Sequence, residues 1–126
     1  MRFFCLVILW WLAACNAPSP HFSAVPATRI AVNGSIFDVR MRGTLAEAVR
    51  VTPQYAPRFG PIRYRAGLAM ALVSGCSVTT VLGDQAQAVG RLDCPDRRRP
   101  TVRVDRACKR ITPEGVTYPA YRCQPG

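Results

Sequence analysis

The sequence predicts an α+β fold: a small antiparallel sheet of βββαββ order carries one helix on a face and precedes a disulfide-tied, arginine-rich C-terminal extension. Three observations support this fold class. Apolar and polar residues alternate through 28–42, apolar residues recur at helical spacing through 61–74, and β-branched residues dominate the run after residue 76. Together these patterns predict one helix between two hairpins, with a third strand joining the first hairpin.

The first predicted hairpin covers residues 28–42. Ile30 and Val32 alternate with polar neighbours and precede Asn33-Gly34, the dipeptide that two-residue hairpin turns favour. The return strand alternates in the same way, so one face of the hairpin is apolar and the other presents arginines.

Residues 45–52 allow two interpretations. The run Thr-Leu-Ala-Glu at 44–47 matches a capping box, which would begin a short helix. Alternation of side-chain character through the same residues favours a third strand, and this is the interpretation that we prefer. We expect the following loop, which holds Tyr55 and Phe59, to pack on the core as a lid.

Residues 61–74 form the predicted helix. Pro61 suits its first position and Gly75 suits the residue just past its end. Arg63 and Arg65 lie near its N-terminus, where they are either solvated or part of an anion site. The apolar face consists of Ile62, Ala66, Ala69, Met70 and Val73.

The second predicted hairpin spans residues 76–94, with turn residues at 83–85. Cys76 and Cys94 lie at equal distances from its centre, so a disulfide between them would close its open end.

Residues 95–126 are rich in arginine and proline, and the alternation around 102–104 suggests a short edge strand. Four cysteines allow three disulfide connectivities. We prefer Cys76–Cys94 with Cys108–Cys123, since each pair brackets a plausible hairpin. Each closed loop would contribute about 3 kcal/mol in the chain-entropy treatment. The absence of a Cys-x-x-Cys pair with a neighbouring histidine argues against zinc, so we predict no metal site.

The first residues of the chain have the layout of a secretory signal. Met1-Arg2 provides a positive start, the run from Phe3 is almost wholly apolar, and small residues follow it. The apolar run is shorter than the roughly 20 residues that a spanning helix needs.

The sequence Leu12-Ala13-Ala14-Cys15 resembles the lipobox of bacterial lipoproteins. The resemblance covers residues 1–15 only, and the rest of the chain looks like small uncharacterised envelope lipoproteins. It implies cleavage before Cys15, a diacylglyceryl group on the sulfur of this residue and an acylated amino group. An ordinary secretory signal, cut near Ala14 or Ala17, is the alternative. Asn16 favours the outer membrane over the inner membrane.

These patterns divide the chain into four segments. Residues 1–14 are a lipoprotein signal peptide, and 15–27 hold the lipidated Cys15 and a disordered Pro/Ala/Ser spacer. Residues 28–94 are the α+β core domain, and 95–126 are the basic extension. We expect the protein in the bacterial cell envelope, anchored by lipid and facing the periplasm.

The formal charge of +10 makes polyanions candidate partners. The cationic segment comprises Arg97, Arg98, Arg99, Arg103, Arg106, Lys109 and Arg110. It could bind lipid head groups, lipopolysaccharide or cell-wall polymers, and this is the alternative function. Nucleic acid is a poor candidate because aromatic residues do not interleave with these cations.

No catalytic constellation emerges from the sequence, and we predict a non-catalytic structural or protein-interaction domain without a cofactor. The single histidine, His21, lies in the predicted spacer, so a Ser/His/Asp arrangement has no well-placed base. An envelope protein would dock on the sheet face or on the loop near Tyr55 and Phe59.

Overall fold

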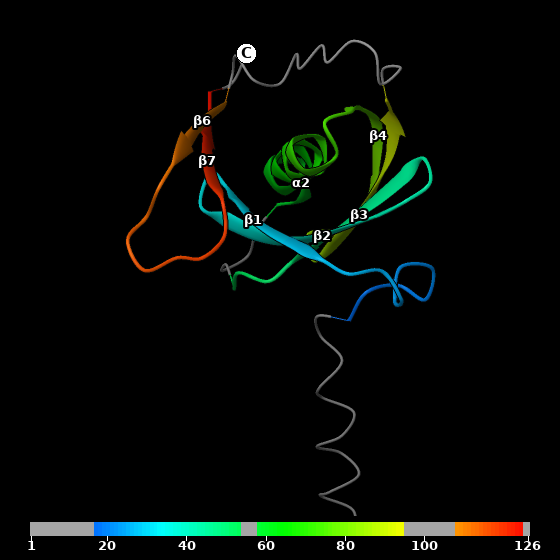
Figure 1. The fold of residues 1–126 in the computed structure, drawn as a ribbon. Helices are drawn as coiled ribbons and strands as arrows, with labels where there is room; N and C mark the ends of the chain where they lie inside the picture. The colour runs from blue at the N-terminus through cyan, green and yellow to red at the C-terminus, as the bar shows by residue number, and fades with distance from the viewer. Residues whose placement is uncertain (1–16, 54–57, 95–107, 125–126) are drawn as a thin grey trace, which may run out of the picture.

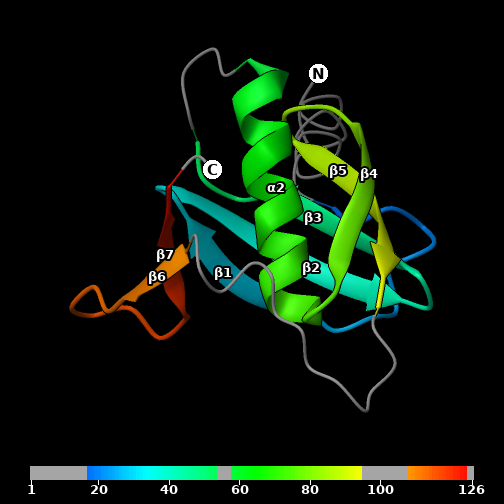
Figure 2. The same cartoon turned by 90° about the horizontal axis from the view of Figure 1, so that it is seen from above.

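A single sheet curls around helix α2 (Phe59–Ser74), as seen along the helix axis in Figure 1 and from above in Figure 2. The structure is a computed structural model that describes residues 17–53, 58–94 and 108–124. Seven strands form the sheet: β1 (Thr28–Val32), β2 (Ser35–Arg42), β3 (Leu45–Arg50), β4 (Ser77–Gly83), β5 (Gln87–Asp93), β6 (Cys108–Ile111) and β7 (Ala120–Cys123).

The strand order across the sheet is β4-β5-β3-β2-β1-β7-β6, and all pairs are antiparallel except β1 with β7, which are parallel. The predicted small antiparallel sheet of βββαββ order, followed by a separate extension, is therefore wrong. The strand count, the strand order and the mixed pairing all differ, and the fold is mostly β.

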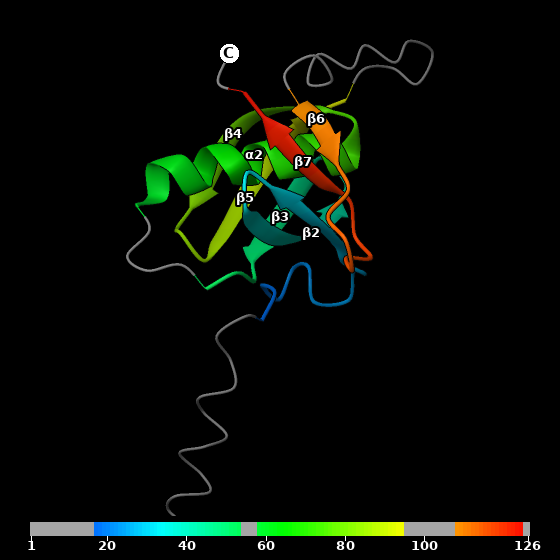
Figure 3. The ribbon, with the colours of Figure 1, turned by 90° about the vertical axis from the view of Figure 1, so that its left-hand side faces the viewer.

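The C-terminal hairpin joins the sheet because β1 would otherwise leave one backbone edge unpaired. Ala31 donates its N–H to Pro119 O at 3.0 Å and Asn33 donates to Tyr121 O at 3.0 Å. The Asn33 side chain then accepts the N–H of Cys123 at 2.7 Å. Figure 3 shows β6 and β7 continuing the sheet beyond β1.

The first hairpin and the third strand occur where the sequence places them. Asn33 and Gly34 both have positive φ, at 49° and 81°, as a two-residue hairpin turn requires. Residues Leu45–Arg50 are a strand, so the alternative of a capped helix there is wrong. Pairing on both sides, with β2 and β5, satisfies the backbone of this strand.

Helix α2 begins at Phe59, two residues before the predicted start, and ends at Ser74. Gly75 follows in the left-handed conformation, with φ of 70°, and donates its N–H to Ala71 O at 2.8 Å. This terminates the helix as the sequence predicts.

The helix packs closely on the inner face of the sheet because the residues between them are small. Gly90 of β5 lies under Met70: a Cβ at this glycine would stand 2.8 Å from Met70 Sδ and 3.0 Å from Val78 Cγ1. The buried residues of this core include Ile30, Val32, Phe37, Val39, Ala46, Ala48, Ile62, Ala66, Ala69, Met70, Ala88 and Leu92.

The outer face of the sheet, which points away from α2, is partly covered by residues 17–27 (Figure 1). Phe22 is 2% exposed and Glu47 of β3 is fully buried. Glu47 Oε1 accepts the backbone N–H of Ser19 at 2.9 Å and a hydrogen bond from the Gln87 side-chain amide. Arg42 Nη1 donates to His21 O at 2.7 Å.

The described part of the predicted disordered spacer is therefore ordered and docked on the sheet. The physical reason is that it carries an apolar anchor, Phe22, while the arginines of β2 supply donors for its carbonyl groups. Arg40 Nε also donates to Val25 O, at 3.2 Å. A proline-rich composition alone did not reveal these partners.

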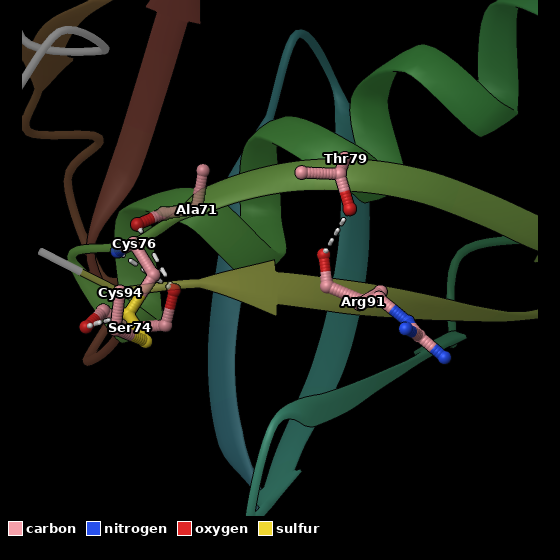
Figure 4. The surroundings of a disulfide bond; sticks show 6 residues. All are labelled: Ala71, Ser74, Cys76, Thr79, Arg91 and Cys94. Atoms are coloured by element: carbon pink, nitrogen blue, oxygen red, sulfur yellow. Dashed lines mark hydrogen bonds between the residues drawn. A yellow bond between two sulfur atoms is a disulfide. The ribbon is translucent and has the colours of Figure 1, made fainter.

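Both preferred disulfides are present in the structure. Cys76–Cys94 joins the start of β4 to the end of β5 and closes the open end of this hairpin (Figure 4). Cys108–Cys123 joins the start of β6 to the end of β7. Both cysteines of the second pair are buried, so this disulfide belongs to the core of the sheet and does not merely tie off an extension.

On the outer face, Arg29 and Asp38 form a bidentate ion pair, with Nε–Oδ1 at 2.7 Å and Nη2–Oδ2 at 2.9 Å. The hydrogen bond from Arg29 lowers the pKa of Asp38 from its ordinary value, although burial opposes it. Attraction to Arg29 and Arg40 acts in the same direction as the hydrogen bond. This carboxylate therefore stabilises the folded state more when it is ionised.

We predict that Asp38→Asn lowers the free energy of unfolding at neutral pH by about 0.2–1 kcal/mol. The folded-state pKa lies below the unfolded one, so the stabilisation is complete above the unfolded pKa and is lost as the pH falls through the folded pKa. Urea unfolding of both proteins at neutral pH and in strong acid measures this. An equal loss at both pH values would contradict the assignment to the ionised carboxylate.

Candidate functional site

A groove of about 610 Å³ lies between helix α2 and strand β4. Its helix side is lined by Gly60, Arg63, Tyr64, Gly67, Leu68 and Ala71, and its strand side by Ser77, Val78, Thr79, Thr80 and Val81. The turn at Gly75 and Cys76 returns the chain directly along the helix, so β4 runs antiparallel to α2 and forms one wall of the groove.

Small side chains open the groove. Gly67 stands opposite Val81, whose Cγ2 would be 3.4 Å from a Cβ at Gly67. Ala71 and Val78 also line the groove, and with Leu68 and Val81 they make much of its lining apolar. An extended chain with small or β-branched side chains fits such a space.

Strand β4 is the last strand at its side of the sheet, and within residues 17–53, 58–94 and 108–124 it pairs only with β5. Its other backbone edge borders the groove. The register shifts between Val78 and Thr80, where a bulge interrupts the ladder. Thr79 Oγ1 donates to Arg91 O at 3.4 Å across this irregularity (Figure 4).

The charge of the groove is positive. Of the described residues that line it, Arg63 alone is charged, and its side chain is exposed. The helix has no acidic residue in its first turn and no side-chain cap, so nothing there neutralises its positive end. Arg65, the other predicted arginine of this turn, is instead held by Ser35, to which its Nη1 donates at 3.0 Å.

A second cationic surface lies on the β6–β7 hairpin. Lys109 pairs with Arg122 in the register, so two positive side chains stand opposite each other on neighbouring strands. Both are exposed, as is Arg110. The other predicted polyanion-binding residues, Arg97, Arg98, Arg99, Arg103 and Arg106, lie outside the described residues, as does Cys15.

The predicted docking surfaces differ from the groove. Residues 17–27 cover part of the sheet face, while Tyr55 lies outside the described residues and Phe59 is the first residue of α2. The groove was not predicted from the sequence, because its presence depends on β4 lying at the end of the sheet. The small residues Gly67 and Ala71 were a usable signal for close packing, but not for an open space beside it.

Glu47 is the one buried acidic side chain in the described part of the chain, and its Oε2 has no hydrogen-bond partner there. It faces the docked residues 17–27 and lies opposite Arg40 in the register. Its contacts hold the N-terminal segment, so it serves the architecture of the outer face.

Among the residues described, no three His, Cys, Asp or Glu side chains gather in a cluster able to hold a metal ion. Nor is any helix in residues 17–53, 58–94 and 108–124 long and apolar enough to cross a membrane.

Comparison with protein-family models, with curated proteins and with solved structures found no match.

We predict that Gly67→Ala and Gly90→Ala change stability in opposite directions. Alanine in the helix should raise the free energy of unfolding by about 0.5–1 kcal/mol, since its Cβ meets Val81 only at an ordinary contact distance of 3.4 Å. A Cβ at Gly90 would overlap Met70 Sδ at 2.8 Å and should cost about 1–3 kcal/mol. Urea unfolding tests both; a Gly90→Ala protein as stable as the parent would contradict the close approach of helix and sheet.

Proposed function

We propose that this protein is a lipid-anchored protein of the bacterial envelope whose domain binds an extended segment of another envelope protein. The observation that carries the proposal is the groove between α2 and β4, which runs beside the edge of a seven-residue strand that no other strand in residues 17–53, 58–94 and 108–124 covers. An extended peptide can pair with such an edge and place alternate side chains in the groove.

The groove favours this occupant over a compact ligand. Its long wall is a strand that has one backbone edge paired with no other strand of the described residues, and natural proteins usually cover or protect such an edge. Its floor is apolar through Val78 and Val81, and its polar groups are mostly the hydroxyls of Ser77, Thr79 and Thr80. Affinity would come from main-chain hydrogen bonds and selectivity from the side chains that enter the groove.

The partner segment should carry an acidic residue or a terminal carboxylate near Arg63. This arginine lies at the N-terminal end of α2, where the helix dipole also favours negative charge. No acidic residue lines the groove in the described part of the chain, so nothing there competes for Arg63.

Binding of envelope polyanions is the second candidate function. Lys109 and Arg122 stand opposite each other, and like charges in such a pair repel. An anionic polymer along β6 and β7 would relieve this repulsion. Binding of this kind weakens as salt rises.

The lipid anchor rests on the lipobox-like sequence around Cys15. We predict that Cys15→Ser abolishes both acyl labelling and membrane association of the exported protein, because every acyl chain of the proposed anchor is attached to this residue. Cys5→Ser, within the leader, is the matched control and should keep both. A Cys15→Ser protein that still fractionates with membranes would contradict the anchor.

The peptide-binding proposal predicts a charge preference that Arg63 determines. The probes are two synthetic seven-residue peptides of alternating valine and threonine, both acetylated and amidated at their ends, one with glutamate and the other with lysine as the last residue. The chain from residue 15 onward, with Cys15→Ser, should bind the glutamate peptide more tightly, and Arg63→Glu should reverse the preference. Calorimetry measures the affinities, and protection of β4 amides from hydrogen exchange locates the peptide.

Arg110→Glu makes the same charge change at the far edge of the sheet and should leave the peptide preference unchanged. It should weaken binding of lipopolysaccharide at low salt if the second candidate function holds. A preference that Arg63→Glu does not alter, with no protection along β4, would rule out the groove as the peptide site.

A further inference from the structure

The described chain is fixed to the outer face of the sheet almost from its first residue. The N–H of Ser19 donates to the fully buried Glu47 of β3 at 2.9 Å, and Phe22 is buried three residues later. Arg42 Nη1 donates a hydrogen bond to the backbone carbonyl oxygen of His21 at 2.7 Å. The N-terminal segment therefore leaves the domain from a defined point on the face opposite α2 (Figure 1).

The proposed lipid attachment site is only four residues before this fixed point. Four residues span at most about 14 Å even when fully extended. A domain of about 100 residues has a radius of gyration near 13 Å, so the helix side lies beyond the reach of this tether. An acyl chain on Cys15 that enters a bilayer must bring the outer face of the sheet close to the lipid head groups.

The side chains around this point suit a lipid surface. Arg42, Leu45 and Arg91 follow one another in register across β2, β3 and β5, so they share the outer face. Arg42 and Arg91 are exposed, and cations next to an anionic bilayer strengthen binding to it. Asp93 lies further along β5 on the same face, beyond this row.

An exposed apolar side chain completes the surface. Leu82 of β4 is 67% exposed and pairs with Val89, which in turn pairs with Glu47, so Leu82 also points to the outer face. A leucine beside arginines is the combination that interfacial membrane surfaces use.

We propose that the lipid on Cys15 holds the outer face of the sheet, with Arg42, Arg91 and Leu82, against an anionic membrane surface, and that the α2–β4 groove is thereby directed away from it. This orientation rests on the proposed lipid anchor. The short tether sets it, because residues 17–27 are docked and not free.

Tryptophan reporters test the orientation, because both tryptophans of the chain, Trp10 and Trp11, lie in the predicted leader. Leu82→Trp places a reporter on the outer face, and Tyr64→Trp places one on α2, where the parent side chain is 48% exposed. The lipidated protein is reconstituted in vesicles of phosphatidylethanolamine and phosphatidylglycerol at about three to one, doped with a head-group nitroxide lipid. We expect quenching of Leu82→Trp to exceed that of Tyr64→Trp by about twofold or more, because the two positions lie on opposite layers.

Equal quenching, or stronger quenching of Tyr64→Trp, in protein that floats with the vesicles would overturn the orientation while leaving the anchor intact. Protein that does not float would overturn the anchor and the orientation together. A flexible Gly/Ser linker of about 20 residues, inserted between Asn16 and Ala17, should bring the two quenching values together. If the linker leaves the difference unchanged, the short tether does not set the orientation.

Discussion

The close approach of α2 to the sheet, which depends on the absence of a side chain at Gly90, determines much of the architecture. Met70 occupies the space that a Cβ at Gly90 would need. The helix can then sit inside the curl of the sheet and reach β1, β2 and β3 with small residues such as Ala66 and Ala69. Beside β4, the small residues Gly67 and Ala71 of the helix leave space between helix and strand, and this space is the groove.

Local signals predicted the individual elements from residue 28 to 94 because each depends on near neighbours in the chain. Asn33-Gly34 specifies its turn by backbone conformation, and Gly75 ends the helix in the same way. Cysteine spacing indicated both disulfides, since each pair closes a hairpin. None of these signals needs information from a distant segment.

The features that the sequence did not predict all depend on contacts between distant segments. The parallel pairing of β7 with β1 joins residues about 90 positions apart through two strand residues and the Asn33 side chain, too little to leave a pattern in the sequence. The same holds for Ser19 and Glu47, 28 residues apart. Proline and alanine around Ser19 are typical of a spacer, while a single buried Phe22 decides the outcome. The groove followed from strand order, which local alternation cannot give.

The docked N-terminal segment also has a mechanical consequence. A force applied at residue 17 acts first on the hydrogen bond between Ser19 and Glu47 and on the burial of Phe22. It acts on the pairing of β1 only afterwards. Release of residues up to Thr28 would free roughly 35 Å of chain at about 3.3 Å per residue, with β1 still paired on both sides. Residues 17–27 can thus detach and extend under tension at the attachment point, while the sheet around α2 and both disulfides stay intact.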